Sequence, residues 1–342
     1  MVKNKIVAHL ETWRLYSILW SGMVSLAGAC LAFGDFPPVK IAALAFFIPL
    51  IGWIAALYAM DYLDRKLDGI QKSQRPIPSG RIQPKEAVFF AFFFAAVGLA
   101  LSFFLGWMNV ILVFLVAIST LIYSRFSKPR GLLANINRGL VTLLTFFFGV
   151  SAVYMTRNHI SSSLDCILFL SFVFFIHDTN TNIVGAMRDV QGDRQGGYIS
   201  TPVKYGIKRA LIISCFLSIL FISLSLFSVY LFNFLQYPSR FFVVFFLAVS
   251  LLCVMYTKMF TSIHSIDRKK ALMAHEFFVT ERVIFALAFI FGVATNFVIP
   301  LIIFVVSVIV TVVLQLLIRD RYEFERKEDD GDCFLVVESK IV

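Results

Sequence analysis

Charged residues are scarce in this sequence. Asp, Glu, Lys and Arg make up 15% of its 342 residues, whereas soluble domains typically contain about a quarter. Hydrophobic residues make up 59%, more than one water-soluble core of this length could bury. Apolar runs of about 20 residues, the length that crosses the hydrocarbon layer of a membrane, recur throughout. The composition excludes an ordinary soluble domain and predicts an all-α, polytopic membrane helical bundle.

Residue patterns that commonly build reactive sites are also missing. The five cysteines share no metal-ligand spacing, and four fall within apolar runs, which favours packed cysteines over a disulfide framework. We find no pattern typical of a nucleophile–base triad, a cysteine–histidine metal site or a nucleotide-binding loop. The first apolar run, from Trp13 to Phe33, is too long for a signal-peptide core and is expected to be a retained span.

About ten apolar segments are expected to cross the membrane, with both termini on one side. Their expected bounds are 14–33, 40–62, 85–106, 108–124, 135–156, 164–188, 209–234, 241–261, 281–296 and 298–318. Lys and Arg gather in alternate loops, at 63–84, 125–138, 188–209 and 258–282. By the positive-inside rule these loops and the N-terminus face the cytoplasm. The net charge of +10 then reflects topology and contact with the lipid bilayer, and no nucleic-acid partner is expected.

The chain is expected to form one transmembrane domain over residues 1–318. Residues 319–342 are charged and non-periodic, which predicts a partly disordered cytoplasmic tail. The stretch ATNFVIP contains turn-forming residues and divides 281–318 into two spans in this interpretation, although one kinked helix is the alternative.

Three aspartates close the second apolar segment, in the stretch MDYLDRKLDGIQKSQRPIPSG (60–80). At about 100° per residue, a helix places Asp64 about −60° and Asp68 about −20° from Asp61, so the three carboxylates face one way. Like charges on one face repel unless something positive lies between them, and carboxylate oxygens suit Mg²⁺. A solvated helix end, paired with Arg65 and Lys66, explains this stretch alone equally well.

A second polar stretch, HDTNTNIVGAMRDVQGDRQGGYISTPVKYG (177–206), closes the sixth apolar segment. Helical geometry places a stripe of polar residues within about 60° of Asp178, namely Asn182, Gly185, Asp189 and Asp193. Asp178 and Asn182 are expensive in a membrane unless they face an interior cavity. Three glycines then end the helix and free backbone N–H groups that can bind anions: Gly192, Gly196 and Gly197. A helix end followed by a polar turn would explain the glycines but not the buried Asp and Asn.

Both acidic stretches are predicted at cytoplasmic helix ends, where they could face each other across one cavity. Mg²⁺ between them would attract a polyanion, most naturally a diphosphate. Candidates for its outer oxygens are Arg14, Lys72, Arg75, Lys128 and Arg194, each of which could instead serve topology and lipid contact. Among the histidines, His177 is expected either to support Asp178 or to be packed, and His159, His264 and His275 are expected to be solvated.

The two stretches resemble the signature motifs of the UbiA superfamily of intramembrane prenyltransferases. The family's Asn-x-x-x-Asp-x-x-x-Asp motif and its Lys…Arg-Pro loop match Asp64, Asp68, Lys72 and Arg75. Its second motif, which ends in Gly-Asp-Arg-x-x-Gly, matches the region 178–198 and places carboxylates at Asp189 and Asp193. YSRFSKPRGLLAN is similar to a third motif, through Tyr123, Lys128 and Asn135, and ETWRLYSILW to the entry of the first helix, through Arg14. The matches span roughly residues 10–210.

Two positions depart from the family pattern. Met60 stands where the family has the first Asn, so Asp61 is the candidate replacement, or one Mg²⁺ takes an extra water. Asn182, with Asp178 one turn earlier, stands for the upstream carboxylate of the second motif. The family is usually described with nine helices, so about nine to ten are expected around a central cavity, and a tenth has no counterpart.

The resemblance implies a Mg²⁺-dependent prenyltransferase that acts on a prenyl diphosphate. It assigns the metal to Asp61, Asp64, Asp68, Asn182, Asp189 and Asp193, with Asp64, Asp68, Asp189 and Asp193 as the catalytic carboxylates. It assigns the diphosphate to Arg14, Lys72, Arg75, Tyr123, Lys128 and Arg194, with Asp178 and Asn135 supporting the ligands. Loss of pyrophosphate would leave an allylic carbocation in an apolar tunnel, where a hydrophobic, most readily aromatic, acceptor captures it.

Two other functions stay open at this point. A UbiA-type terpene cyclase would use the same metal ligands, with the cation captured by the substrate's own double bonds. A transporter would predict inverted repeats and charges at the membrane midplane. The two acidic motifs instead recur in one orientation, which predicts two pseudo-equivalent halves. Neither the prenyl chain length, the acceptor nor the oligomeric state follows from the sequence.

Overall fold

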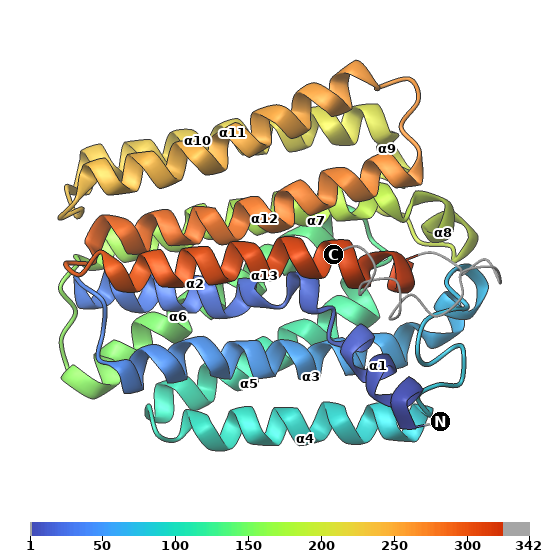
Figure 1. The fold of residues 1–342 in the computed structure, drawn as a ribbon, viewed down its shortest axis with the longest axis horizontal. Coiled ribbons are helices and arrows are strands. Elements are labelled where there is room, and N and C mark those ends of the chain that lie inside the picture. Colours follow the sequence, from blue (N-terminus) through green and yellow to red (C-terminus); the bar gives the residue numbers. More distant parts are fainter. Residues whose placement is uncertain (1, 324–342) are drawn as a thin grey trace, which may run out of the picture.

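The computed structural model describes residues 2–323, and these residues form helices with no strand among them. The helices are α1 (Val2–Thr12), η1 (Leu15–Ser17), α2 (Leu19–Phe33), α3 (Val39–Gln71), α4 (Pro84–Ser102), α5 (Trp107–Ile122), η2 (Tyr123–Ser127), α6 (Leu132–Arg157), α7 (Leu164–Arg188), α8 (Val190–Gln195), α9 (Thr201–Tyr205), α10 (Ile207–Phe232), α11 (Pro238–Thr261), α12 (Arg268–Val293) and α13 (Val298–Glu323). The long helices lie side by side along one axis, with short connections at both ends (Figure 1).

Eight of the described helices are long and apolar enough to cross a membrane. The bent pair Lys5–Ser17 and Leu19–Phe33 makes a ninth if it is counted as one span. Helix α12 is of similar length but carries charged residues in its first half, and it packs against α2, α7 and α11 inside the bundle. The predicted membrane helical bundle is therefore confirmed, with eight or nine apolar spans among the described residues against the nine to ten helices predicted.

The helix bounds differ from the predicted spans where polar residues continue a helix. Helix α3 runs to Gln71, so the first acidic motif is helical, and α12 begins at Arg268 rather than near 281. The gap between α12 and α13 confirms the predicted division of 281–318. Helix α13 continues to Glu323, past the predicted start of the tail at 319, and residues 324–342 lie outside the described residues. The single-domain division and the two pseudo-equivalent halves stay predictions.

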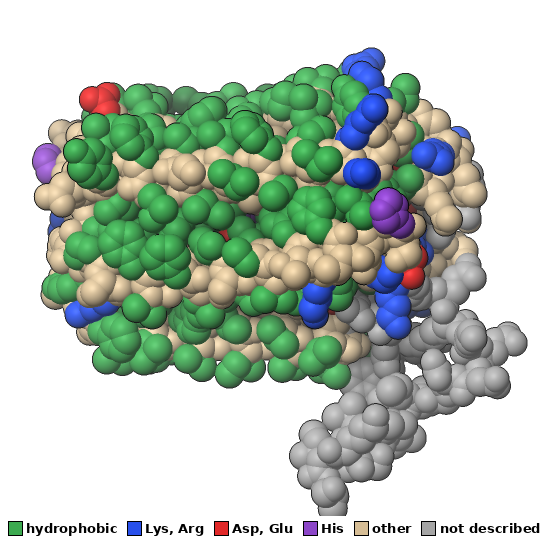
Figure 2. Space-filling view, turned by 90° about the horizontal axis from the view of Figure 1, so that it is seen from above, with side chains coloured by type: hydrophobic (Ala, Val, Ile, Leu, Met, Phe, Trp, Pro, Cys, Tyr) green, Lys and Arg blue, Asp and Glu red, His purple; other side chains and the backbone are tan. Residues whose placement is uncertain are grey.

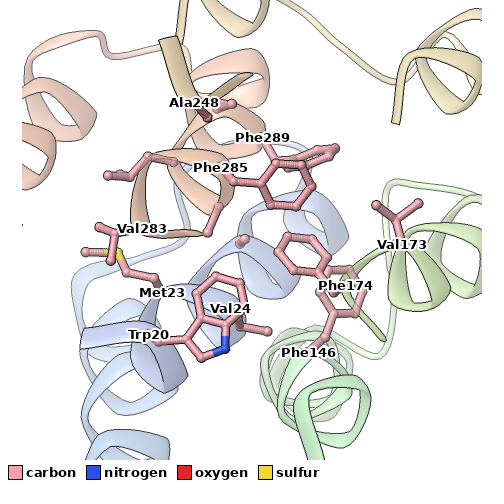
Figure 3. Packing of buried hydrophobic residues seen from close by; sticks show 14 of the residues in the cluster. Trp20, Met23, Val24, Phe146, Val173, Phe174, Ala248, Val283, Phe285 and Phe289 are labelled. Carbon is pink, nitrogen blue, oxygen red and sulfur yellow. The ribbon is translucent and has the colours of Figure 1, made fainter. Parts of the chain in front are cut away.

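Aromatic rings from several helices meet in the centre of the bundle (Figure 3). The ring centroid of Phe174 on α7 lies 5.2 Å from that of Phe146 on α6, and 5.4 and 5.5 Å from those of Phe285 and Phe289 on α12. Lipid tails are as apolar as these rings, so close packing, rather than removal from water, is what stabilises such a core in a membrane.

Glycines let α2 and α6 approach closely. A Cβ built on Gly149 would lie 1.7 Å from the backbone oxygen of Ser25, and one on Gly28 would lie 2.4 Å from the backbone oxygen of Phe146. No side chain fits at either position, which is the small-residue packing typical of membrane helices. The contact fixes α2 against α6, and α6 packs in turn on α7.

Charged side chains gather mainly at one end of the bundle. Figure 2 shows hydrophobic side chains over the middle of the visible face, with most Lys and Arg towards one end. Figure 1 places α1, α8 and α9 at that same end. We call this region the charged end. It includes the C-terminal turns of α3 and α7 and the first turns of α6 and α12, and it contains the cavity described next.

Candidate active site

A cavity of about 190 Å³ lies at the charged end and collects residues from both acidic motifs. Its walls come from η1, α3, η2, α6, α7, α8, α9 and α12. The predicted site residues that line it are Arg14, Asp64, Asp68, Lys72, Arg75, Tyr123, Lys128, Asn135, Asp178, Asn182, Asp189 and Asp193. Helices distant in sequence thus bring the two motifs to one place, as the sequence predicted.

Two of the three aspartates on α3 face this cavity. Asp64 forms an ion pair with Lys128, and Asp68 accepts a hydrogen bond from Nη1 of Arg75 at 2.8 Å. Burial alone would lower the pKa of Lys128, but Asp64 raises it above its ordinary value. Each aspartate is thereby neutralised by a base from a connecting segment: Lys128 directly follows η2, and Arg75 follows α3.

Asp61 departs from the prediction. Met60, four residues before Asp64, lies on the cavity wall, whereas Asp61 is buried, does not line the cavity and pairs with Arg14. Met60 shares the face of Asp64 because residues four apart lie one above the other on a helix. Met60, rather than Asp61, therefore lies on the cavity wall, and a metal-binding role of Asp61 stays a prediction. Arg14 has left-handed backbone angles, φ 46° and ψ 52°, at the break between α1 and η1, where its side chain reaches both Asp61 and the cavity.

The second motif is interrupted at Asp189 rather than at its glycines. Helix α7 ends at Arg188, Asp189 has φ −100° and ψ 8°, and α8 begins at Val190, so the helix is not continuous from Asp178 to Asp193, although the residues of the predicted stripe all line the cavity. Asp189 nevertheless faces the cavity, and Oδ1 accepts a hydrogen bond from Nζ of Lys72 at 2.8 Å. Burial would raise the pKa of Asp189, but Arg188 and Lys72 hold it well below its usual range.

Asp193 is the carboxylate of the second motif that forms no ion pair with any described residue. It is 8% exposed, and this burial raises its pKa to about 6. A buried carboxylate without a cationic partner is poised to accept a cation, since a nearby positive charge would favour its ionised form.

Amide groups support the wall between the motifs. Nδ2 of Asn135 donates to Oδ1 of Asn182 at 2.8 Å, and the Thr201 hydroxyl donates to Oδ1 of Asn135 at 2.6 Å. Asn135 thus joins Asn182 to Thr201, and its predicted support of the metal ligands stays a prediction. The carbonyl oxygen of Asn182, which would bind a metal, already accepts a hydrogen bond.

A histidine–glutamate pair and a neighbouring ion pair join α7 to α12. Nε2 of His177 lies 2.9 Å from Oε2 of Glu281, both side chains are fully buried, and the imidazole stacks on Phe285. The next residues form the second pair, with 3.9 Å between Nη1 of Arg282 and Oδ1 of Asp178. His177 is therefore packed and paired with Glu281 rather than with Asp178, and the two pairs fix the register of α7 against α12.

Four residues that the sequence analysis places in charged loops or in solvent line the cavity wall: Arg138, Arg188, His275 and Arg282. Nη2 of Arg138 lies 3.6 Å from Oδ2 of Asp178, and its guanidinium lies over the ring of Trp53. His275 packs on Gly185 and lines the cavity, so its predicted solvated position is wrong. Arg194 is exposed and does not line the cavity, so its predicted contact with the diphosphate stays a prediction.

The electrostatics of the wall favour a large anion. Seven Lys and Arg side chains line the cavity against five Asp. No three His, Cys, Asp or Glu side chains of the described residues are grouped closely enough to hold a metal ion. Like charges separate unless a cation lies between them, and here the cations that neutralise the carboxylates are lysine and arginine. The donors themselves, carboxylate oxygens on both sides of one cavity, are those that Mg²⁺ prefers.

Comparison with known proteins gives the same assignment. The profile of the UbiA prenyltransferase family matches residues 21–281. A digeranylgeranylglyceryl phosphate synthase from Korarchaeum cryptofilum is 31% identical over 216 residues, which are 63% of this chain and 74% of that one.

Two solved structures share the fold. A UbiA homologue from Aeropyrum pernix K1 has a TM-score of 0.67 at 18% identity, over 79% of this chain and 96% of that one. One from Archaeoglobus fulgidus, bound to GPP and Mg²⁺, has a TM-score of 0.60 at 17% identity, over 83% and 99%. With a family match across most of its length and the same helical bundle, the chain belongs to the UbiA prenyltransferase family.

Proposed function

We propose that this protein transfers a prenyl group from a prenyl diphosphate to an acceptor within the membrane, with Mg²⁺ as cofactor. The observation that carries the proposal is one cavity that joins both acidic motifs to a surplus of basic side chains. A homologue in this family was solved with GPP and Mg²⁺. An excess of positive charge beside carboxylates suits a magnesium diphosphate, because the metal needs oxygen ligands and the phosphates need cations.

Four carboxylates would hold the metal: Asp64, Asp68, Asp189 and Asp193. Bound Mg²⁺ would neutralise charge on the diphosphate and so make pyrophosphate a better leaving group. Asp193 fits this role because it has no cationic partner among the described residues. The side chains of Met60 and Asn182 fit it less well, since a thioether is a poor ligand for a hard cation and the amide oxygen is already hydrogen-bonded.

The ion pairs suggest how the basic residues take part. Lys128, Arg75 and Lys72 pair with Asp64, Asp68 and Asp189 respectively. When these carboxylates turn to a metal, the three bases are released together and can donate to phosphate oxygens at the same place. Partner exchange of this kind leaves no charge unpaired in either state, which avoids the cost of a buried lone charge.

The departing pyrophosphate leaves an allylic cation that the surrounding rings can stabilise. Trp53, Tyr16 and Tyr123 line the cavity, and aromatic faces attract cations. A smaller hollow shares Trp53 and Arg138 with the cavity and continues between α2 and α6, past Trp20 and Val141. We assign the start of the prenyl chain to the apolar side of this hollow, formed by Trp20, Val24 and Val141.

Two kinds of acceptor are candidates: an aromatic molecule and a lipid that carries a phosphate group. The sequence favoured an aromatic acceptor, whereas the name of the Korarchaeum relative specifies a glyceryl phosphate product. Arg138 and Arg282 favour the second choice, because both border the cavity and the smaller hollow. Nε of Arg282 is buried and has no hydrogen-bond partner among the described residues, so it can still donate to an anion.

We place the active site on the cytoplasmic side. The loops predicted to be cytoplasmic by their Lys and Arg content all lie at the charged end, together with the cavity.

The experiment that tests the proposal is release of pyrophosphate by the purified protein from geranyl, farnesyl and geranylgeranyl diphosphates, with and without Mg²⁺. Products are identified by mass spectrometry after addition of an aromatic acid or a prenylated glyceryl phosphate. Asp64→Asn and Asp189→Asn, one from each motif, are compared with Glu86→Gln, a carboxylate paired with Lys5 outside the cavity.

Mg²⁺-dependent release that both cavity variants lose and Glu86→Gln keeps is the expected result. If a cyclic hydrocarbon forms without an acceptor, the activity is cyclisation of the prenyl diphosphate rather than prenyl transfer. No release from any of the diphosphates, even with an extract that supplies acceptors, would overturn the proposal.

A further inference from the structure

Helix α13 lies beyond the part of the chain that matches the family, which ends at residue 281. Its last described residue, Glu323, is nevertheless 1% exposed and in contact with residues of the cavity wall. A carboxylate is costly to bury unless it is paired and hydrogen-bonded. Its partners therefore indicate why it is there.

One carboxylate of α13 joins three other elements. Oε1 of Glu323 lies 3.1 Å from Nη1 of Arg188, at the end of α7, and accepts a hydrogen bond from the Tyr16 hydroxyl of η1 at 3.4 Å. Oε2 lies 3.3 Å from Nη2 of Arg268 in the first turn of α12. Two of these partners, Arg188 and Tyr16, line the cavity.

Arg188 connects Glu323 to the second acidic motif. Its Nε and Nη2 lie 3.2 and 2.9 Å from the two carboxylate oxygens of Asp189, while its Nη1 faces Glu323. One guanidinium is therefore shared between the carboxylate that we assign to the metal and a carboxylate from outside the family match. Burial would raise the pKa of Glu323, but Arg188, followed by Lys72 and Arg75, lowers it to about 2, so the group is ionised at neutral pH.

We propose that Glu323 is a positioning residue of this active site, which holds Arg188 so that Asp189 can turn from the guanidinium to the metal. A guanidinium shared by two carboxylates binds each less tightly than it would bind one alone. Without the charge on Glu323, Arg188 would be neutralised by Asp189 only, and Asp189 would be harder to release. The inference rests on the proposed function, because it takes Asp189 as a magnesium ligand.

The experiment measures binding rather than turnover. Purified wild type and Glu323→Gln are titrated by calorimetry with Mg²⁺ in the presence of geranyl thiolodiphosphate, an analogue that does not ionise readily. We expect the Mg²⁺ concentration for half saturation to rise about five- to tenfold in the variant, which lies within the range of coupling between residues in one ion-pair network. Glu323→Asp, which keeps the charge, should recover part of this loss and serves if Glu323→Gln does not fold.

A double-mutant cycle separates positioning from general support of the fold. In an Arg188→Gln background the substitution Glu323→Gln should no longer change Mg²⁺ binding, because its effect passes through Arg188. Glu86→Gln, whose partner Lys5 lies at the same end but outside the cavity, should bind Mg²⁺ like wild type.

Each outcome decides between the two proposals. Unchanged Mg²⁺ binding in Glu323→Gln, or an equal loss with and without Arg188, would overturn the positioning role while the proposed function stands. Wild-type protein that binds neither the analogue nor Mg²⁺ would overturn the proposed function, and the role of Glu323 with it.

Discussion

The middle of the bundle and its charged end are held together in different ways. In the middle, Gly28 and Gly149 let α2 and α6 touch and aromatic rings from α6, α7 and α12 interlock, so each contact has one arrangement. At the charged end, side chains of opposite sign pair across helices, as Lys72 does with Asp189. Packed surfaces resist rearrangement, whereas ion pairs can exchange partners at little cost. The first region fixes where the helices stand, and the second can respond to a ligand.

The largest effect is expected where a glycine of the packed region gains a side chain. Gly149→Ala would place Cβ 1.7 Å from the backbone oxygen of Ser25, so α2 and α6 must separate. We expect a loss of stability on the order of 3 kcal/mol, at the upper end of overpacking costs. The measurement is the thermal midpoint in detergent. Gly52→Ala is the matched control, since a Cβ there meets nothing within 4 Å, and equal midpoints in the two variants would refute the argument.

A base of the charged end should affect chemistry more than stability. Lys128→Gln removes the partner of Asp64 and one donor proposed for the diphosphate. We expect turnover to fall about 100-fold, as for loss of one preorganised donor, with a smaller loss of stability than in Gly149→Ala, because the side chain of Lys128 is 25% exposed and water can reach the carboxylate that it leaves. Pyrophosphate release at saturating substrate measures this effect. The exposed Lys85 gives the control Lys85→Gln. A drop in stability as large as that of Gly149→Ala would abolish the distinction between the two regions.

A smaller effect is expected from pH. The pKa of Asp193 is raised by burial from 3.8 to about 6. Its contribution to stability is therefore fully present below pH 3.8 and is lost as the pH rises through about 6. In metal-free buffer, Asp193→Asn should melt about 2 °C above wild type at pH 7.5 and together with it near pH 4. Thermal midpoints across this pH range check the sign, and a variant less stable than wild type at pH 7.5 would contradict it.

The smallest effect is expected at Arg194. Its side chain is exposed and lies outside the cavity wall, although its motif suggested contact with the diphosphate. Arg194→Ala should leave the apparent affinity for geranyl diphosphate within about twofold of wild type, as usual for surface substitutions. Arg75→Gln, on the wall, is the comparison. If both variants lose the same affinity for geranyl diphosphate, the diphosphate site extends beyond the cavity.

The fold was largely predictable because apolar runs of membrane length have few alternatives. The first acidic motif was predictable too, since spacings of four place Asp64 and Asp68 on one face of α3. The position of Asp61 was not, because its partner Arg14 lies 47 residues earlier in the chain. In the second motif, the break at Asp189 leaves the side chain pointing where an unbroken helix would also have sent it.

Charged residues of the wall were the hardest to predict. Arg138, Arg188 and Arg282 carry the same signal in sequence as lysines and arginines that merely face the cytoplasm. A charge near the end of an apolar run says that the side chain avoids lipid, and not whether it meets bulk water or an enclosed cavity. Glu323 lies in a segment with no periodicity, so only the structure brings it to Arg188.

The length of α3 has a consequence for how substrate reaches the enzyme. Its 33 residues extend about 50 Å, while the hydrocarbon layer is about 30 Å thick. Counted from Val39, Asp61 stands about 33 Å along the helix, about one hydrocarbon thickness from the start of the helix. In a bilayer whose hydrocarbon layer begins at Val39, the carboxylates would stand at about the depth of the lipid phosphates. An amphiphile with a diphosphate head and an apolar tail occupies that depth by itself, so it could arrive by sideways diffusion, without leaving the leaflet in which it is dissolved.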